Sequence, residues 1–161
     1  MAVDMFLKLD GIEGESKDKE HKNQIHIESF SWGLNQTGTF GAGGGGGAGK
    51  VQVQDISISK FTDKASTPLM LHCANGKHIK EGLITVRKAG EKPLDYLKIK
   101  LSDVLVSSVQ SAGNNGSDIL SENLTLNFAK VEVQYQEQSA TGEPEGGPKI
   151  FGWDVKANAK L

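Results

Sequence analysis

Gly44 to Lys50 (GGGGAGK) is the stretch whose residue types and spacing come closest to a chemical motif. It fits the pattern G-x-x-x-x-G-K of phosphate-binding loops. Such a loop also needs a Ser or Thr after the lysine to hold magnesium, and a helix whose N-terminus faces the phosphates. Here Val51 follows Lys50, and the next residues alternate like a strand. We therefore do not predict nucleotide binding.

The remaining candidates for chemistry are isolated side chains. His72 and Cys73 are adjacent on a predicted helix, where neighbours point about 100° apart, so they cannot easily share a metal ion. No spacing of His and Cys resembles a zinc site. Glu143 and Glu145 lie in a loop rich in Gly and Pro, where carboxylates are normally solvated. We predict no catalytic residues, no metal and no cofactor, as in a structural or binding protein.

Composition excludes several classes of partner. The chain has 161 residues and a net charge of −2, without the basic face of a nucleic-acid binder. Cys73 is the only cysteine, which suits folding in a reducing cytoplasm. The N-terminus, MAVDMFLKLDG, lacks the long apolar core of a signal peptide. No apolar run approaches the ~20 residues of a membrane helix, so membrane insertion is not predicted.

Alternating apolar residues predict seven or eight strands. The apolar phase changes near Gln54-Asp55 and near Ala129-Lys130, and we predict a β-bulge at each place. One helix is predicted, with Thr67 as its cap, Pro68 at its first position and Gly76 ending it. Long, bulged antiparallel strands with one short flanking helix predict a mainly β fold, an antiparallel β-barrel that forms a single domain over residues 1–161.

The segment from Ser29 to Lys60 combines two strands with a loop almost free of side chains. Phe30, Trp32 and Leu34 alternate and are predicted to be buried, which turns Ser29 and Ser31 outward. From Gly41 to Gly49 only two residues are not glycine. Ordering such a loop is entropically costly, so we expect a contact outside the subunit to compensate.

Segments along the whole chain resemble those of one known family. These are the opening AVDMFLKLDGIEGESKDK, the SFSWG segment, the glycine loop followed by KVQVQDISISK, the CANGKH segment, and the closing ENLTLNFAKVEVQY and GWDVKANAK. In this combination they are similar to the Hcp (haemolysin-coregulated) proteins, which form the inner tube of bacterial type VI secretion systems.

The resemblance implies a β-barrel assembled as a homohexameric ring with a wide channel. Rings would stack into a tube inside a contractile sheath, with a VgrG-type spike at its tip. Contraction would eject the tube together with small effector proteins held in the channel. The protein would assemble in the bacterial cytoplasm and then be secreted without a signal peptide.

The resemblance also assigns roles to particular residues. We expect Ser29 and Ser31 to line the channel and contact cargo, since small hydroxyls would make a smooth polar wall. The family's extended loop, which contacts neighbouring subunits and the adjacent ring, maps onto residues 36–51. Its candidate contact residues are Phe40, as an anchor, and Gly43, Gly44, Gly45, Gly46, Gly47 and Lys50.

Two other classes of function remain as alternatives. A monomeric, lectin-like β domain would bind a small ligand through its loops, and it predicts a native mass near 17.2 kDa. A hydrolase with a scattered active site would need a nucleophile in contact with a base, whereas the sequence offers only isolated histidines. Ser29 and Ser31 would then simply face solvent.

Overall fold

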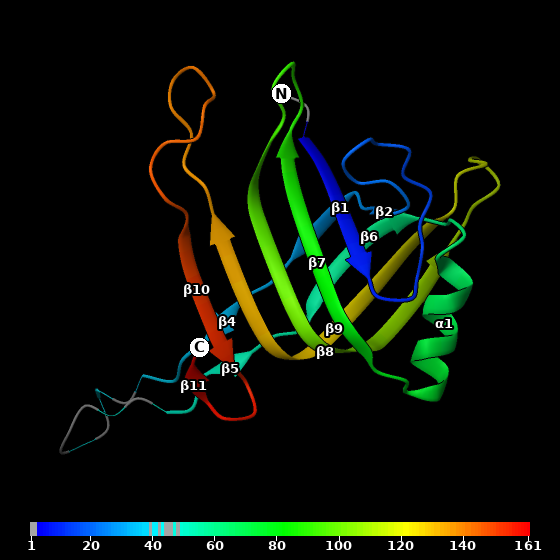
Figure 1. The fold of residues 1–161 in the computed structure, drawn as a ribbon. Helices are drawn as coiled ribbons and strands as arrows, with labels where there is room; N and C mark the ends of the chain where they lie inside the picture. The colour runs from blue at the N-terminus through cyan, green and yellow to red at the C-terminus, as the bar shows by residue number, and fades with distance from the viewer. Residues whose placement is uncertain (1–2, 39, 42, 44–46, 48) are drawn as a thin grey trace.

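The computed structural model describes residues 3–38, 40–41, 43, 47 and 49–161. It is mainly β, with antiparallel strands and one helix (Figure 1). The strands, in chain order, are β1 (Val3–Leu9), β2 (Ile25–His26), β3 (Ser29–Ser31), β4 (Leu34–Asn35), β5 (Gln52–Val53), β6 (Ile56–Phe61), β7 (Ile79–Lys88), β8 (Leu94–Ala112), β9 (Ser121–Tyr135), β10 (Lys149–Asp154) and β11 (Ala159–Lys160). The helix α1 (Ser66–Asn75) lies between β6 and β7.

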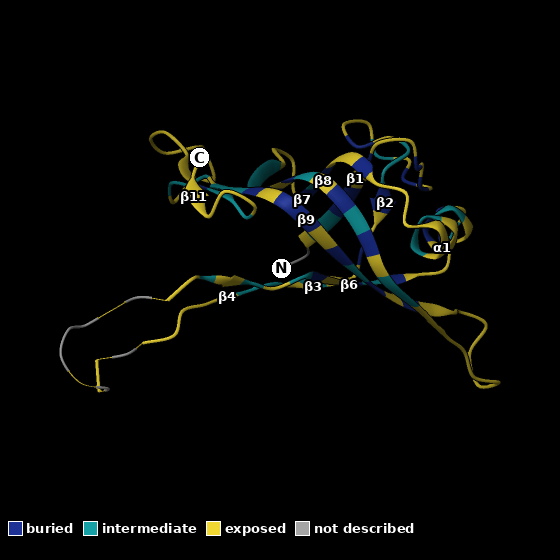
Figure 2. Cartoon of the chain, turned by 90° about the horizontal axis from the view of Figure 1, so that it is seen from below, coloured by how far each residue is buried: buried dark blue, intermediate teal, exposed yellow. Residues whose placement is uncertain are grey.

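The long strands β8 and β9 connect two layers. The upper layer runs in the order β11-β10-β9-β8-β7-β1-β2. The lower layer is formed by β3, β6 and the parts of β8 and β9 nearest the turn that joins them. β9 takes part in both layers, since its first part, Ser121–Leu126, pairs with β6 and its last part, Lys130–Tyr135, pairs with β10. Seen from below, β4, β3 and β6 follow one another along the lower side of the molecule (Figure 2). One hydrophobic cluster fills the space between the layers.

The pairings do not close the sheet into the predicted barrel. The path ends at β11 and β2, and the branch through β6 ends at β3. The layers are instead joined where the chain crosses between them: the Ile27 N–H bonds to Met5 O in the upper layer, and the Glu28 N–H bonds to Ser59 O in the lower one. The mainly β, antiparallel prediction with one helix is confirmed. Within the described residues the strand ladders alone do not form a closed barrel, and these two backbone hydrogen bonds bridge the gap between β2 and β3.

The first predicted bulge is confirmed. Ser31 pairs with Ser57, but Leu34 pairs with Val53, so the later strand holds one extra residue between these two pairs. The second phase change, near Ala129, arises differently. Asp103 of β8 has a φ of 53°, and Asp103 and Ala129 drop out of the ladder while the register on either side is unchanged. At this point β8 and β9 therefore change together which of their faces is turned to the core. The register shift between the two strands lies elsewhere, in β8 between Val106 and Ser108.

The helix begins earlier than predicted. It starts at Ser66, after Ala65, so Thr67 is not its cap and Pro68 is its third residue. The preceding turn is fixed by Asp63, whose Oδ1 accepts from the Ala65 N–H. Gly76 ends the helix with a φ of 69°, as predicted. Within the described part of the chain, no helix has the length and apolarity needed to span a membrane.

Candidate functional site

A polar face covers the outer side of the lower layer. Residues directly opposite each other on antiparallel strands point to the same side of the sheet. One such row is formed by Ser29, Ser59, Asn123 and Gln110, and the next by Ser31, Ser57, Thr125 and Ser108. The apolar partners between these rows, such as Ile58 and Leu124, are buried in the core. We call these eight residues, with Asp55, Ser107 and Asn127, the polar face.

The side chains of the polar face bond to one another. Ser59 Oγ donates to Asn123 Oδ1 at 2.6 Å, and Ser107 and Ser108 both lie within hydrogen-bond distance of Thr125 Oγ1, at 2.7 and 2.6 Å. These contacts satisfy part of the hydrogen-bonding capacity without a ligand. The result is a wall of hydroxyl and amide groups that needs no partner to be stable.

Asp55 is the only charged side chain of the polar face. Its two carboxylate oxygens accept hydrogen bonds from Ser107 Oγ at 2.7 Å and from Asn127 Nδ2 at 2.8 Å. Ser107 reaches Asp55 because it is the extra residue at the register shift of β8. The carboxylate is thus held by β8 and β9, and Asp55 itself lies in the chain between β5 and β6.

Ser29 and Ser31 are exposed, and they lie on the polar face at the strand that ends the lower layer. The prediction that Phe30 and Trp32 pack inward is confirmed, since both contact the core cluster. Leu34 was predicted to be buried but is 41% exposed, because β4 extends beyond the core and pairs only with β5. The other residues of the polar face were not singled out from the sequence.

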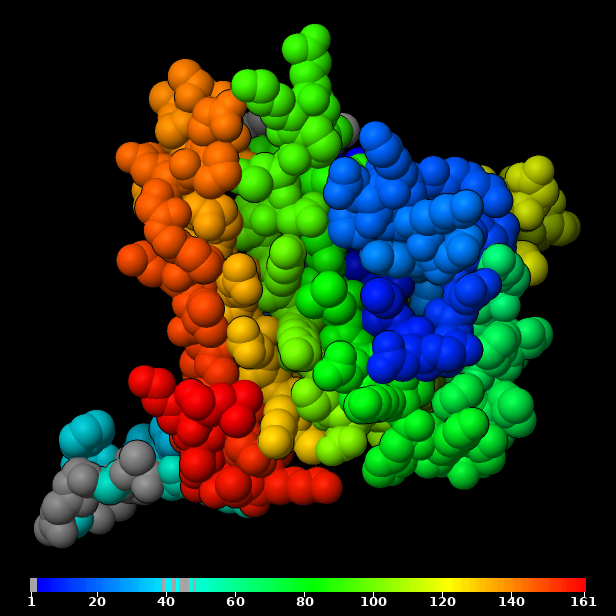
Figure 3. Space-filling view, in the orientation of Figure 1, coloured from blue at the N-terminus to red at the C-terminus, as the bar shows by residue number. Residues whose placement is uncertain are grey.

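The arm, formed by β4, β5 and the described residues between them, projects from the body. Figure 3 shows its described residues standing away from the red C-terminal strands. Phe40 is 90% exposed, and Gly43, Gly47 and Lys50 are exposed as well. Gly44, Gly45 and Gly46 lie outside the described residues. The arm's base is fixed by Trp32, whose Nε1–H donates to Gln54 O at 2.9 Å.

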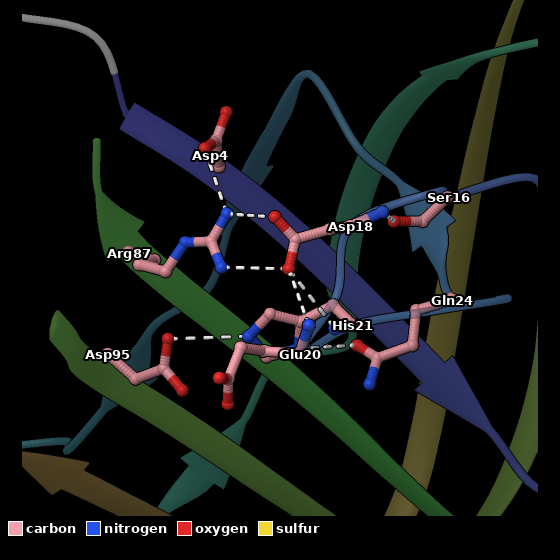
Figure 4. Close-up of polar contacts among 8 residues, drawn as sticks. All are labelled: Asp4, Ser16, Asp18, Glu20, His21, Gln24, Arg87 and Asp95. Carbon is pink, nitrogen blue, oxygen red and sulfur yellow. Dashed lines mark hydrogen bonds and ion pairs between the residues drawn. The ribbon is translucent and has the colours of Figure 1, made fainter. Parts of the chain in front are cut away.

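A second polar cluster fastens the loop between β1 and β2 to the sheet (Figure 4). Arg87 of β7 donates from both terminal nitrogens to Asp18 of this loop, and from Nη2 to Asp4. The hydrogen bonds from Arg87 hold the pKa of Asp18 well below its ordinary value, and those to Asp18 hold the pKa of Arg87 above its own. His21 stacks on Phe6 with 4.3 Å between ring centroids and bonds to Asp95.

A third polar cluster lies at the start of α1, around a fully buried lysine and glutamate. Lys60 Nζ lies 3.0 Å from Glu122 Oε1 and 2.9 Å from Asp63 Oδ1, and it also donates to Ser66 Oγ and Phe61 O. The side chains of Lys60 and Glu122 are both 0% exposed. The cluster joins β6, α1 and the base of the β8–β9 hairpin. Solvent does not reach the Lys60 and Glu122 side chains, which indicates a structural role.

The candidates for chemistry are not brought together. His72 Nδ1 lies 2.8 Å from Pro68 O of its own helix, and Cys73 packs against the core. Glu143 pairs with Lys92 on the surface at 3.0 Å. In the described residues, no group of three or more His, Cys, Asp or Glu side chains could hold a metal ion.

Comparison with known proteins gives the family. The model of the family described as "Type VI secretion system effector, Hcp" matches residues 6–135. The curated protein hcp1 of Pseudomonas aeruginosa is 51% identical over 161 residues, which cover 99% of either chain. The chain belongs to the Hcp family. It is therefore a type VI secretion protein.

Solved structures of Hcp proteins share this fold. Hcp1 from Salmonella typhimurium superposes with a TM-score of 0.80 at 34% identity, over the full length of both chains. A type VI secretion system effector from Yersinia pestis gives 0.78 at 36% identity, over 94% of this chain and all of its own. A further type six secretion system protein gives 0.93 at 29% identity, over 99% of this chain and 100% of its own. The likeness extends through β10 and β11, beyond the part that the family model matches.

Proposed function

We propose that this Hcp-family protein is the tube subunit of a type VI secretion system. Homohexameric rings stack into a tube, which is ejected and carries small effectors in its channel. The observation that carries the proposal is the 51% identity to an Hcp protein over almost the whole of both chains. The mechanism is mechanical, and no step of it requires catalysis, a metal or a cofactor.

The partners follow from this role. The tube is assembled in the bacterial cytoplasm inside a contractile sheath, carries a VgrG-type spike and leaves the cell with its cargo. Phe40, Lys50 and the glycines between them contact a neighbouring subunit and the adjacent ring. The arm supports this proposal, because its strands β4 and β5 pair with each other in a separate two-stranded sheet and its described residues project from the subunit. Contact with a neighbour offsets the entropy lost when its glycines are ordered.

The polar face is the proposed wall of the channel, with Ser29 and Ser31 in contact with cargo. Because its hydroxyl and amide groups already bond to one another, each contact with a cargo protein is weak. Six copies in a ring, and many rings in a tube, multiply these weak contacts. Weak contacts of this kind can retain a cargo during assembly and still release it after ejection.

Replacing Ser31 with arginine tests the channel wall. We expect rings to form normally, because Ser31 is exposed and outside the core, while effectors in the culture medium fall by roughly tenfold or more, since the change is repeated in every copy. Secreted proteins would be measured by quantitative mass spectrometry, with the tube protein itself as the reference. Ser31→Ala is the matched control and should leave export unchanged. Normal effector export by Ser31→Arg would show that Ser31 does not line the channel.

A further inference from the structure

The chain contains two Asn-Gly pairs, Asn75-Gly76 and Asn115-Gly116. In such a pair the backbone nitrogen of the glycine can attack the side-chain amide of the asparagine, which converts the asparagine into an acid. Glycine favours this attack because it has no side chain to block the approach and the widest range of backbone angles. In a folded protein the reaction therefore depends on how firmly the surrounding backbone is held.

The first pair is held by the end of α1. Asn75 is the last residue of the helix, and the Gly76 N–H donates to His72 O at 3.0 Å. The side chain of Asn75 is engaged as well, since its Oδ1 accepts a hydrogen bond from the Lys77 N–H at 2.8 Å. The last turn of the helix must open before the Gly76 nitrogen can reach the Asn75 side-chain carbon.

The second pair lies in the turn that joins β8 to β9, where residues 111–120 are all exposed. Figures 1 and 2 show this turn projecting from the body beyond α1. Among the described residues, no group bonds to the side-chain amide of Asn115. The Gly116 N–H donates to a side chain, Asn114 Oδ1, at 2.9 Å. Because this bond lies in an exposed turn, it can break without the unfolding of a strand or helix.

We propose that Asn115 is a site of spontaneous deamidation, whereas α1 protects Asn75. The Gly116 nitrogen gives up its proton to hydroxide and attacks Asn115 Cγ, and the new C–N bond closes a succinimide ring. The bond from Cγ to the side-chain nitrogen breaks, and this nitrogen takes a proton from water and leaves as ammonia. Water then opens the ring at one of its two carbonyl carbons, which gives aspartate or isoaspartate. Each chain consumes one water and releases one ammonia, without an enzyme or a cofactor.

The reaction changes the charge of the turn but not its packing. The product adds one negative charge to a chain whose net charge at pH 7 is −2, and the charge appears close to Asp118. No residue from 113 to 118 belongs to the hydrophobic core, so the fold is retained. The fraction of modified chains then records the time since synthesis. The inference goes beyond the proposed function and does not depend on it, because the reaction needs only one folded chain.

Asn114 controls the rate of this reaction. While its Oδ1 accepts from the Gly116 N–H, the proton that the attacking nitrogen must lose is held and the turn is fixed. Asn114→Ala removes this hydrogen bond and should speed the loss of the Asn115 amide by roughly two- to tenfold, the factor that corresponds to one ordinary hydrogen bond. An unchanged rate in this variant would overturn the role of Asn114.

Ageing of the purified full-length protein tests the proposal. Samples kept at pH 8 would be digested with trypsin at intervals, since peptide 65–77 carries Asn75 and peptide 101–130 carries Asn115. Fragmentation in a mass spectrometer locates the acid within each peptide. Asn115 should react at least roughly tenfold faster than Asn75, which corresponds to an opening free energy of about 1.4 kcal/mol at the end of α1. The two rates should become similar in urea, which unfolds the helix, and the Asn115 rate should rise with pH.

Matched variants isolate the reacting pair. Asn115→Gln should remove the acidic form that isoelectric focusing detects in the aged protein, because a longer side chain closes the ring far more slowly. Asn75→Gln is the control and should age like the unmodified protein. Gly116→Ala should slow the reaction, since its methyl group obstructs the attack. The turn accommodates this methyl group, because its only close neighbour is the exposed Asn114 side chain, at 3.2 Å from Oδ1.

Three results would overturn the proposal. Asn115 could stay intact in the aged protein, the two pairs could react equally fast in the folded state, or Asn115→Gln could gain the acidic form as quickly as the unmodified protein. Each of these results leaves the tube proposal untouched, since that proposal is decided by native mass and effector export.

Discussion

Replacing Lys60 with methionine is expected to lower the free energy of unfolding by about 3–5 kcal/mol. Lys60 and Glu122 are both fully buried, and Lys60 is the cation that lies against the Glu122 carboxylate. Glu122 Oε2 already has no hydrogen-bond partner among the described residues. Removing the lysine leaves a buried carboxylate without compensation, and this cost exceeds that of the packing change. Urea unfolding followed by fluorescence, at one fixed protein concentration, measures the effect.

Lys64→Met is the matched control for this substitution. Lys64 lies in the same turn, but its side chain is 53% exposed and it reaches Glu13 only at 4.0 Å. Its loss should change the free energy of unfolding by less than about 1 kcal/mol. The double variant Lys60→Met/Glu122→Leu should recover a large part of the lost stability, because an apolar pair can replace a buried ion pair at little cost. A single Lys60→Met variant as stable as the control would contradict the buried cluster.

Replacing Asp18 with asparagine is expected to lower the free energy of unfolding at pH 7 by about 1–3 kcal/mol, because Arg87 loses its charged partner. Arg87 depresses the pKa of Asp18 in the folded state below its ordinary value of 3.8. The stabilisation is therefore fully present above pH 3.8 and is lost as the pH falls toward the folded-state pKa. Melting temperatures measured from pH 7 down to pH 3 should show a constant difference between the two proteins above pH 3.8, which begins to shrink below it.

Glu20→Gln separates this effect from the general loss of an acid in the same loop. Glu20 is exposed, and its carboxylate has no bond among those found in the described residues. Its melting curves should follow those of the unmodified protein at every pH. A constant difference between Asp18→Asn and the unmodified protein down to pH 3 would show that the Asp18 charge is not what stabilises the loop.

Local alternation in the sequence was sufficient to predict the long strands, although the described residues form eleven strands where seven or eight were expected. Leu7 and Leu9, like Leu124 and Leu126, are buried at alternate positions because one face of each strand packs on the core. The bulge near Gln54 followed from the same rule, since Val53 and Ile58 cannot face the core in one unbroken register. Gly76 ended the helix as predicted because only glycine readily adopts its left-handed backbone. The family, and with it the secretion role, came from matching segments along the whole chain.

The alternation of apolar and polar residues could not predict which distant strands pair with one another. Ser31, Ser57 and Thr125 form one row only because β3, β6 and β9 are neighbours in the sheet. No local sequence pattern indicates this order of strands. The buried Lys60–Glu122 pair could have been predicted from the sequence but was not. Lys60 continues the inward phase of Ile56 and Ile58, and Glu122 precedes Leu124 and Leu126 in the same way. Opposite charges at inward positions of two strands indicate a buried pair.

Closure of the sheet into a barrel depends on the same kind of distant contact. Strand count and length do not say whether the last strand returns to the first. Here β9 pairs with β6 at one end and with β10 at the other, and β1 and β6 are bridged by the backbone hydrogen bonds of Ile27 and Glu28 instead of by an unbroken strand ladder.

The native mass of the unmodified protein is the measurement that tests the central claim most directly. Sedimentation over a wide range of concentrations should reveal a species of six chains of 17.2 kDa, as a ring-forming tube subunit requires. That result would also exclude the monomeric, lectin-like domain. A single species of 17.2 kDa at all concentrations would contradict the ring, and with it the channel wall.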